Sequence, residues 1–208
     1  MTREPRLRWM AIATGLLLAL LLTGALWWLA AAWQAWKAGP QPETIVSASL
    51  ESLKEQNILV PFTARFVADP TSRMRRLGMT AQKTLIVPGT VRYELNLGAL
   101  TADDLAWNGD ARRLTVTLPP LAVSAPEMDP ASAVEYRDGE LVLAVTEAER
   151  QLDAANWKAA REEIVAQARG AVPMRLAQTA AINAVTANFA LPLRTAGVDA
   201  VVEVRFKR

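Results

Sequence analysis

The stretch KTLIVPGTVRYELNL, Lys83–Leu97, decides the fold, because it is the most strand-like part of the chain and carries a Pro-Gly pair at its centre. From Val91 onward apolar and polar residues alternate, which predicts a strand with one buried face. Proline cannot donate a ladder hydrogen bond, and Pro88-Gly89 fits the two central positions of a type II turn. We therefore expect two strands, 84–87 and 90–97, that meet at a structural bend or hairpin corner and not at a binding loop.

Other strands are expected on both sides of this stretch. Residues 58–67 are rich in β-branched and aromatic side chains, and residues 114–118 and 198–206 alternate between apolar and polar ones. The pair Asp138-Gly139 lies between two apolar runs and is typical of a two-residue hairpin turn. The sequence thus predicts a strand-rich block over residues 58–145 and a final strand over residues 198–206.

Helical patterns occupy residues 146–196. Thr146 and Glu149 form a capping-box signal, and few helix breakers follow them. Pro173 either kinks one long helix or opens a second helix that runs to about Ala190. The apolar sides of these helices are rich in alanine, which allows close packing on the sheet or on another copy of the chain.

A shorter helix is expected from Thr44, because Val46, Leu50 and Leu53 are spaced to share one face that can dock on a sheet. Together these patterns predict an α+β domain over residues 44–208, with a mostly antiparallel sheet packed against helices.

The N-terminal segment has the composition of a membrane span. No residue from Trp9 to Trp36 is charged, and about twenty consecutive apolar or small residues suffice to cross about 30 Å of hydrocarbon as a helix. Tryptophans gather at both ends, where indole rings favour the headgroup level. A signal peptide cleaved after Ala32 is the alternative, but the apolar run exceeds a usual signal core. We expect residues 1–36 to form a basic tail and one retained transmembrane helix.

The charges beside this span set its orientation. Three arginines precede it, whereas Lys37 is the only nearby cation that follows it, so the N-terminus should be cytoplasmic. Residues 37–43 combine glycine with two prolines and should form a linker. The domain that follows should then lie outside the cytoplasm, in the periplasm if the cell is Gram-negative.

Small residues recur along the span at four-residue spacing: Ala11, Gly15, Ala19 and Thr23. Such a ridge lets two helices approach closely and pair, and it can equally arise by chance in a segment rich in alanine and glycine. The ridge makes a homo-oligomer one expected form of the protein.

Composition removes several kinds of chemistry. The chain contains no histidine and no cysteine, which excludes Ser-His-Asp, Cys-His and ordinary zinc hydrolases. Its net charge of +2 belongs to the N-terminal segment, since residues 1–37 hold four basic residues and one acidic residue. The remainder is close to neutral, so no nucleic-acid partner is expected. No glycine-rich phosphate loop occurs, and we expect no cofactor and no metal.

Three sets of residues could still carry chemistry. Ser124 or Ser52 could meet Lys83 or Lys54 as a Ser-Lys pair, although no motif brings them together. Carboxylates form two further pairs: Asp103 and Asp104 are adjacent, which sends them to opposite faces of a strand, whereas Glu127 and Asp129 are two apart and could both face a hard cation or share a proton. The simpler interpretation of the first pair is turn capping and of the second a surface loop, so we assign no catalytic residue.

A cluster of arginines lies in DPTSRMRRLGMTAQK, a stretch that we expect to be a loop between two strands. Arg73, Arg75 and Arg76 could touch anionic lipid headgroups, because the anchor holds the domain near the bilayer. The alternative is a solvated loop.

The opening stretch, together with Trp107 in DLAWNGD and LTVTLPP at Leu114–Pro120, resembles the family of domain of unknown function DUF4230. The resemblance covers about residues 44–208 and includes the order of an N-terminal anchor, a strand-rich block, a helical segment and a final VEVRF. It implies an architecture and supplies no catalytic residue.

The expected function is that of a membrane-anchored, non-catalytic interaction or scaffold module whose protein partner is not identified. A binding module for lipid, envelope polymer or a small apolar ligand is the first alternative and would need a deep apolar pocket. An enzyme with carboxylate or Ser-Lys chemistry is the second, and it would need buried ionisable groups that lie close together and have shifted pKa values.

Overall fold

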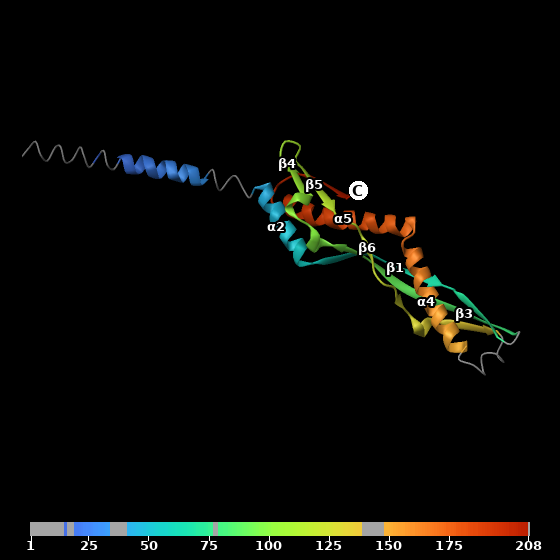
Figure 1. Cartoon of the computed structure of the whole chain (residues 1–208). Coiled ribbons are helices and arrows are strands. Elements are labelled where there is room, and N and C mark those ends of the chain that lie inside the picture. The colour runs from blue at the N-terminus through green and yellow to red at the C-terminus, as the bar shows by residue number, and fades with distance from the viewer. Residues whose placement is uncertain (1–14, 16–18, 34–40, 77–78, 139–147, 208) are drawn as a thin grey trace, which may run out of the picture. The chain divides into compact units, whose positions relative to one another are not determined.

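The computed structural model describes residues 15, 19–33, 41–76, 79–138 and 148–207, and the chain forms two compact units, Met1–Ile45 and Val46–Arg208 (Figure 1). In the first unit residues 19–33 are helical and exposed along their whole length. Across the described parts of the chain, no helix is both long enough and apolar enough to cross a membrane.

The axis of the second unit is strand β3 (Met79–Asn96). Two strands follow one another along it, both antiparallel: β1 (Ile58–Ala68) pairs with residues 87–96 and β2 (Thr71–Arg76) with residues 79–84. Three shorter strands also pair with β3, and they are β6 (Ala122–Val123), β7 (Glu127–Met128) and β8 (Val134–Asp138).

The predicted turn at Pro88-Gly89 is wrong, because β3 continues through it without interruption. Pro88 lies opposite Val67, and its carbonyl accepts a hydrogen bond from the Asp129 N–H at 3.0 Å. Gly89 lies where a helix crosses the strand, and a Cβ there would be 2.8 Å from Ile164 Cδ1. Pro88 and Gly89 therefore take part in the strand pairing and helix packing of one long strand.

A second sheet has the order β4-β5-β9, with β4 (Leu105–Asn108) antiparallel and β9 (Val201–Phe206) parallel to β5 (Arg113–Leu118). The apolar side chains of β5 are fully buried, as predicted. Short 3-10 turns occur at η1 (Leu97–Ala99), η2 (Ala102–Asp104) and η3 (Pro130–Ser132).

Strand β9 begins three residues later than expected, because residues 196–198 close the preceding helix. Gly197 has φ +78° and its N–H donates to Arg194 O at 3.0 Å, while the Val198 N–H donates to Leu193 O at 2.9 Å. These two bonds form a Schellman motif, which needs a residue such as glycine in the left-handed region.

The helices are α2 (Pro42–Glu55), α4 (Ala148–Ala168) and α5 (Ala171–Thr195). Pro173 lies in the first turn of α5, so the helical region is split and not kinked. Helix α5 passes Pro192 and ends five residues beyond the predicted Ala190. Helix α2 begins two residues before Thr44, because proline is favoured in a first turn, so the predicted linker 37–43 ends too late.

Helices α4 and α5 each bury a stripe with four-residue spacing. The stripes are Leu152, Asn156, Ala160, Ile164 and Ala168 on α4, and Ala177, Ala181, Val185, Phe189 and Leu193 on α5. The α4 stripe packs on the alternate residues of β3 that point to the same face, including Leu85, Val91 and Tyr93. An α+β fold with a mostly antiparallel sheet is therefore confirmed. Asp138 ends β8, whereas Gly139 of the predicted hairpin and the predicted cap at Thr146 fall on residues 139–147, which lie outside the described residues.

Candidate functional sites

The most unusual feature of the domain is a lysine in the buried row of β3. Ala81, Lys83 and Leu85 alternate toward the helix-covered face, and the side chain of Lys83 is only 2% exposed. Lysine is almost never fully buried without a partner, so the surroundings of this side chain determine its role.

Acidic side chains from β8 and α4 surround the Lys83 ammonium. We call Lys83 and its three acidic neighbours, Glu135, Glu149 and Asp153, the Lys83 cluster. Nζ forms ion pairs with Asp153 of α4 and, at 2.9 Å, with Glu135 of β8, and it lies 3.9 Å from Glu149. The same Glu149 carboxylate accepts a hydrogen bond from Arg137 at 3.1 Å. The cluster thus ties β3, β8 and the first turns of α4 together through charge.

The backbone of the strand is held at the same point. Asn156, which is 1% exposed, donates a hydrogen bond from Nδ2 to the carbonyl of Lys83 at 2.9 Å. Asn156 therefore replaces the apolar residue that the α4 stripe would otherwise carry there.

Burial alone would lower the pKa of Lys83, but hydrogen bonds to Asp153 and Glu135 and their negative charge raise this pKa above its ordinary value of 10.5. Lys83 is consequently a cation at neutral pH. A lysine that acts as a general base or nucleophile needs the opposite shift.

The serines considered above do not pair with these lysines. Ser124 Oγ accepts the Arg92 N–H at 3.0 Å and donates to Ala125 O at 3.1 Å. Ser52 is exposed on α2, where Lys54 pairs with a glutamate at 3.5 Å. The structure therefore brings Lys83 to carboxylates and not to a hydroxyl.

Asp104 caps the turn η2. Its Oδ2 accepts from the N–H and the hydroxyl of Thr101, both at 3.0 Å, and its Oδ1 pairs with Lys207 at 2.8 Å. Lys207, with the Thr101 hydrogen bonds, lowers the pKa of Asp104. The neighbouring Asp103 is exposed.

Glu127 and Asp129 point to different partners. Glu127 pairs with Arg92 at 2.7 Å, while Asp129 accepts from Ser132 Oγ at 2.7 Å and pairs with Arg65 at 3.3 Å. The hydroxyl of Ser132 is the main cause of the lowered pKa of Asp129. Among the residues that the structure describes, no three acidic side chains gather in a way that could hold a metal ion.

The predicted arginine loop is a strand, because β2 continues the pairing of β1 along β3. Arg73 and Arg75 are exposed, and Arg73 Nε donates to Gln82 on the neighbouring strand at 2.8 Å. Between them, Met74 packs toward Ala81 and Leu152 on the helix-covered face. The backbone of Arg76 belongs to the strand, but its side chain lies outside the described residues.

Of the predicted helix-pairing ridge, Ala11 lies outside the described residues. A Cβ on Gly15 would meet no atom within 4 Å, and the Thr23 hydroxyl donates to Ala19 O of its own helix at 2.8 Å. Pairing of two helices along this ridge therefore stays a prediction.

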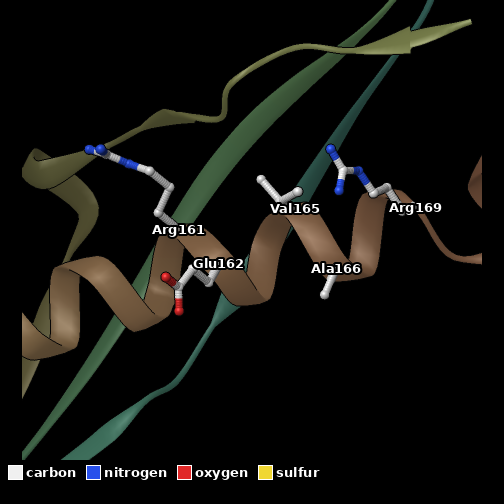
Figure 2. A pocket seen from close by; sticks show the side chains of 5 residues that line it. All are labelled: Arg161, Glu162, Val165, Ala166 and Arg169. Carbon is white, nitrogen blue, oxygen red and sulfur yellow. The ribbon is translucent and has the colours of Figure 1, made fainter.

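A shallow depression lies on the outer flank of α4 (Figure 2). Four of the five residues that line it, Arg161, Glu162, Val165 and Ala166, come from α4, and the fifth, Arg169, directly follows the end of this helix. Figure 2 shows the two arginines and Val165 on one side of the helix, with Glu162 and Ala166 on the other. Because no second element closes it, the depression is not the deep apolar pocket that a ligand-binding module needs.

Sequence reasoning named Lys83 only as one member of a Ser-Lys pair and missed its cluster. The available signal was its phase, because Lys83 falls on the same side of the alternation as Val91 and Tyr93. The false turn at Pro88-Gly89 hid that continuity.

Comparison with known proteins gives one result that bears on identity. No curated protein and no solved structure matches the chain. The model of a family described as "Protein of unknown function (DUF4230)" matches residues 48–204, which span strands β1 to β8, both long helices and the first part of β9. The chain is therefore a member of the DUF4230 family of proteins of unknown function.

Proposed function

We propose that the protein is a single-pass membrane protein whose residues 44–208 form an extracytoplasmic, non-catalytic interaction or scaffold domain. The observation that carries the proposal is the apolar helix at residues 19–33, whose large side chains stay exposed to the surroundings. Leu20 is 74% exposed and Trp27 80% exposed. Hydrophobic groups on all sides of a helix favour contact with lipid, and the uncharged sequence from Trp9 to Trp36 supplies enough length.

The structure of the domain supports a role without catalysis. The Lys83 cluster brings ionisable groups close together around a buried lysine, as an enzyme could use, but the raised pKa of Lys83 favours a cation at neutral pH. A charge network that joins a strand to a helix fits a role in holding α4 on β3.

Anchoring and orientation can be tested with the full chain, which has no cysteine and so accepts single labels. Thr2→Cys marks the N-terminal tail, and Ala187→Cys marks an exposed position of α5. In spheroplasts a membrane-impermeant maleimide should label Cys at position 187 directly and at position 2 only after lysis. Both variants should stay in the membrane pellet after alkaline extraction.

Two outcomes would oppose the proposal. Release into the alkaline supernatant would show that the span is not retained, and labelling of position 2 alone before lysis would show the reverse orientation. Recovery of a shortened chain that begins after Ala32 would indicate the signal peptide instead.

A further inference from the structure

The last strand of the domain leaves one edge of the second sheet open. Strand β9 is terminal in the order β4-β5-β9, and within the described parts of the chain no strand pairs with its outer edge. In Figure 1 it is the dark red strand that ends at C. An open edge presents unpaired N–H and C=O groups that can pair with another strand.

The hydrogen bonds to β5 determine which groups of β9 point outward. The N–H of Val201 donates to Arg112 O and that of Lys207 to Leu118 O, each at 2.9 Å. The backbone N–H and C=O groups of the odd-numbered residues therefore point toward β5. Because these groups alternate in direction along a strand, those of Val202, Val204 and Phe206 point toward the open edge.

We propose that β9 pairs with β9 of a second copy of this chain, antiparallel about a two-fold axis at Val204. In this register Val204 exchanges both hydrogen bonds with its own counterpart, and Val202 does so with Phe206 of the second copy. All three outward-pointing residues then find outward-pointing partners, which is the pattern that an antiparallel ladder requires.

Charge selects this register over its neighbours. With Val204 on the axis, Glu203 lies directly opposite Arg205 of the second copy, twice in each dimer, at the closer non-hydrogen-bonded positions. Moving the two-fold axis by one residue changes these pairs. With the axis at position 203, Glu203 lies opposite Glu203 of the second copy, and with the axis at position 205, Arg205 lies opposite Arg205. Like charges opposite each other are unfavourable.

The apolar side of β9 gives independent support. Leu114, Val116 and Leu118 of β5 are fully buried, whereas their neighbours Val202 and Phe206 on the same face of the sheet stay partly exposed. A second copy that extends the sheet would add Val and Phe side chains beside this half-covered row. The edge, its charges and its apolar face thus fit the same occupant.

The inference rests on the proposed scaffold role, because it names the partner as a second copy, but it does not depend on the membrane anchor. The ion pair of Glu203 with Arg113 at 3.2 Å is exposed and remains available to either register. Span-driven pairing through Gly15 is a separate contact and is tested separately.

The test measures the dimer dissociation constant of the full-length chain in detergent micelles by sedimentation equilibrium. Glu203→Arg or Arg205→Glu alone turns two attractive pairs into two repulsive ones, and we expect each to weaken the dimer about tenfold or more. The double variant Glu203→Arg with Arg205→Glu restores opposite charges and should restore the dimer. An equimolar mixture of the two single variants should also dimerise, because each then supplies what the other lacks.

A cross-link checks the register. Val204→Cys places two thiols at the axis with Cα atoms about 5.5 Å apart, within reach of a disulfide, whereas Val202→Cys places them about 14 Å apart. Oxidation should give covalent dimers only with the first variant.

The inference is overturned if the wild type is monomeric, if the single charge variants dimerise like the wild type, or if the swapped double variant does not recover. Loss of the dimer in Gly15→Leu alone would assign pairing to the span instead. Retention of the same variants in the membrane pellet after alkaline extraction measures anchoring independently of dimerisation. Failure of the β9 interface and failure of the membrane proposal are therefore distinguishable.

Discussion

Replacing Lys83 with methionine tests whether the Lys83 cluster holds α4 on the strand. The side chain is 2% exposed, and Oδ1 of its partner Asp153 is also buried. Removing one member of a buried ion pair costs about 3 to 5 kcal/mol. Because Glu135 and Asp153 each keep 33% of their side-chain surface exposed, water can solvate the remaining carboxylates in part. We expect Lys83→Met to lower the free energy of unfolding by about 2 to 4 kcal/mol.

The assay is urea denaturation of the full chain in micelles, followed by tryptophan fluorescence, for the wild type, Lys83→Met, Asp153→Leu and the double variant. Asp153→Leu should cost less than Lys83→Met, because Lys83 keeps Glu135 and Glu149. The double variant removes both charges and should be more stable than the sum of the two losses predicts, with a coupling of at least about 1 kcal/mol. Additive losses, or a loss below about 1 kcal/mol for Lys83→Met, would refute the role of this pair.

The same variants test the sign of the pKa shift. A group whose pKa is raised by folding stabilises the protein fully below its ordinary value, here 10.5, and loses that contribution as the pH rises through the folded pKa. The difference between the wild type and Lys83→Met should therefore stay constant from about pH 7 to pH 10. A difference that instead rises between these values would mean that burial, which lowers the pKa, outweighs the carboxylates.

The remaining predictions concern packing and capping, each measured as a change in the free energy of unfolding. Gly89→Ala should cost about 1 to 3 kcal/mol by overpacking against Ile164, and Ile164→Val should recover about 1 kcal/mol of it in the double variant, whereas additive losses would exclude the clash. Tyr93→Phe should cost about 1 to 2 kcal/mol, because the buried hydroxyl donates to Ala168 O at 2.7 Å, and an unchanged stability would contradict this cap. Asp104→Asn should destabilise the protein at pH 7 and lose this effect as the pH falls below 3.8 and through the lowered pKa of the folded state, and an effect independent of pH would be inconsistent with it.

The strands and helices with a strong apolar period were predictable from the sequence. In Val91–Leu97 and Leu114–Leu118 every second side chain is buried on one face, and the face is the predicted one. Helix α2 buries Val46, Leu50 and Leu53 as expected. In each case the pattern is local and the burial follows from it, because a strand with period two or a helix with period 3.6 exposes its apolar row until a neighbour covers it.

The turn at Pro88-Gly89 was predicted wrongly because turn statistics describe a chain without neighbours. In the folded domain a partner lies opposite each residue of the pair, and Ile164 occupies the space that a side chain at position 89 would need. Neither contact is visible in the sequence, since Ile164 follows 75 residues later. A glycine that allows another side chain to approach closely and a glycine that allows a turn cannot be distinguished from the sequence alone.

The length of β3 bears on the predicted lipid contact of the arginines. Helix α2 ends beside one end of this strand, where the Leu97 N–H donates to Asn57 O at 2.8 Å, and β2 pairs with the opposite end, where Arg76 faces Met79. The strand has 18 residues, so these two ends are about 60 Å apart. If the proposed anchor holds a bilayer beside α2, Arg73 and Arg75 can reach it only when the domain lies along its surface, and an upright domain would hold them far from it. Self-pairing through β9 does not require that choice, because β5 and β9 lie near the α2 end of the domain, as Figure 1 shows, and not at the far end of β3.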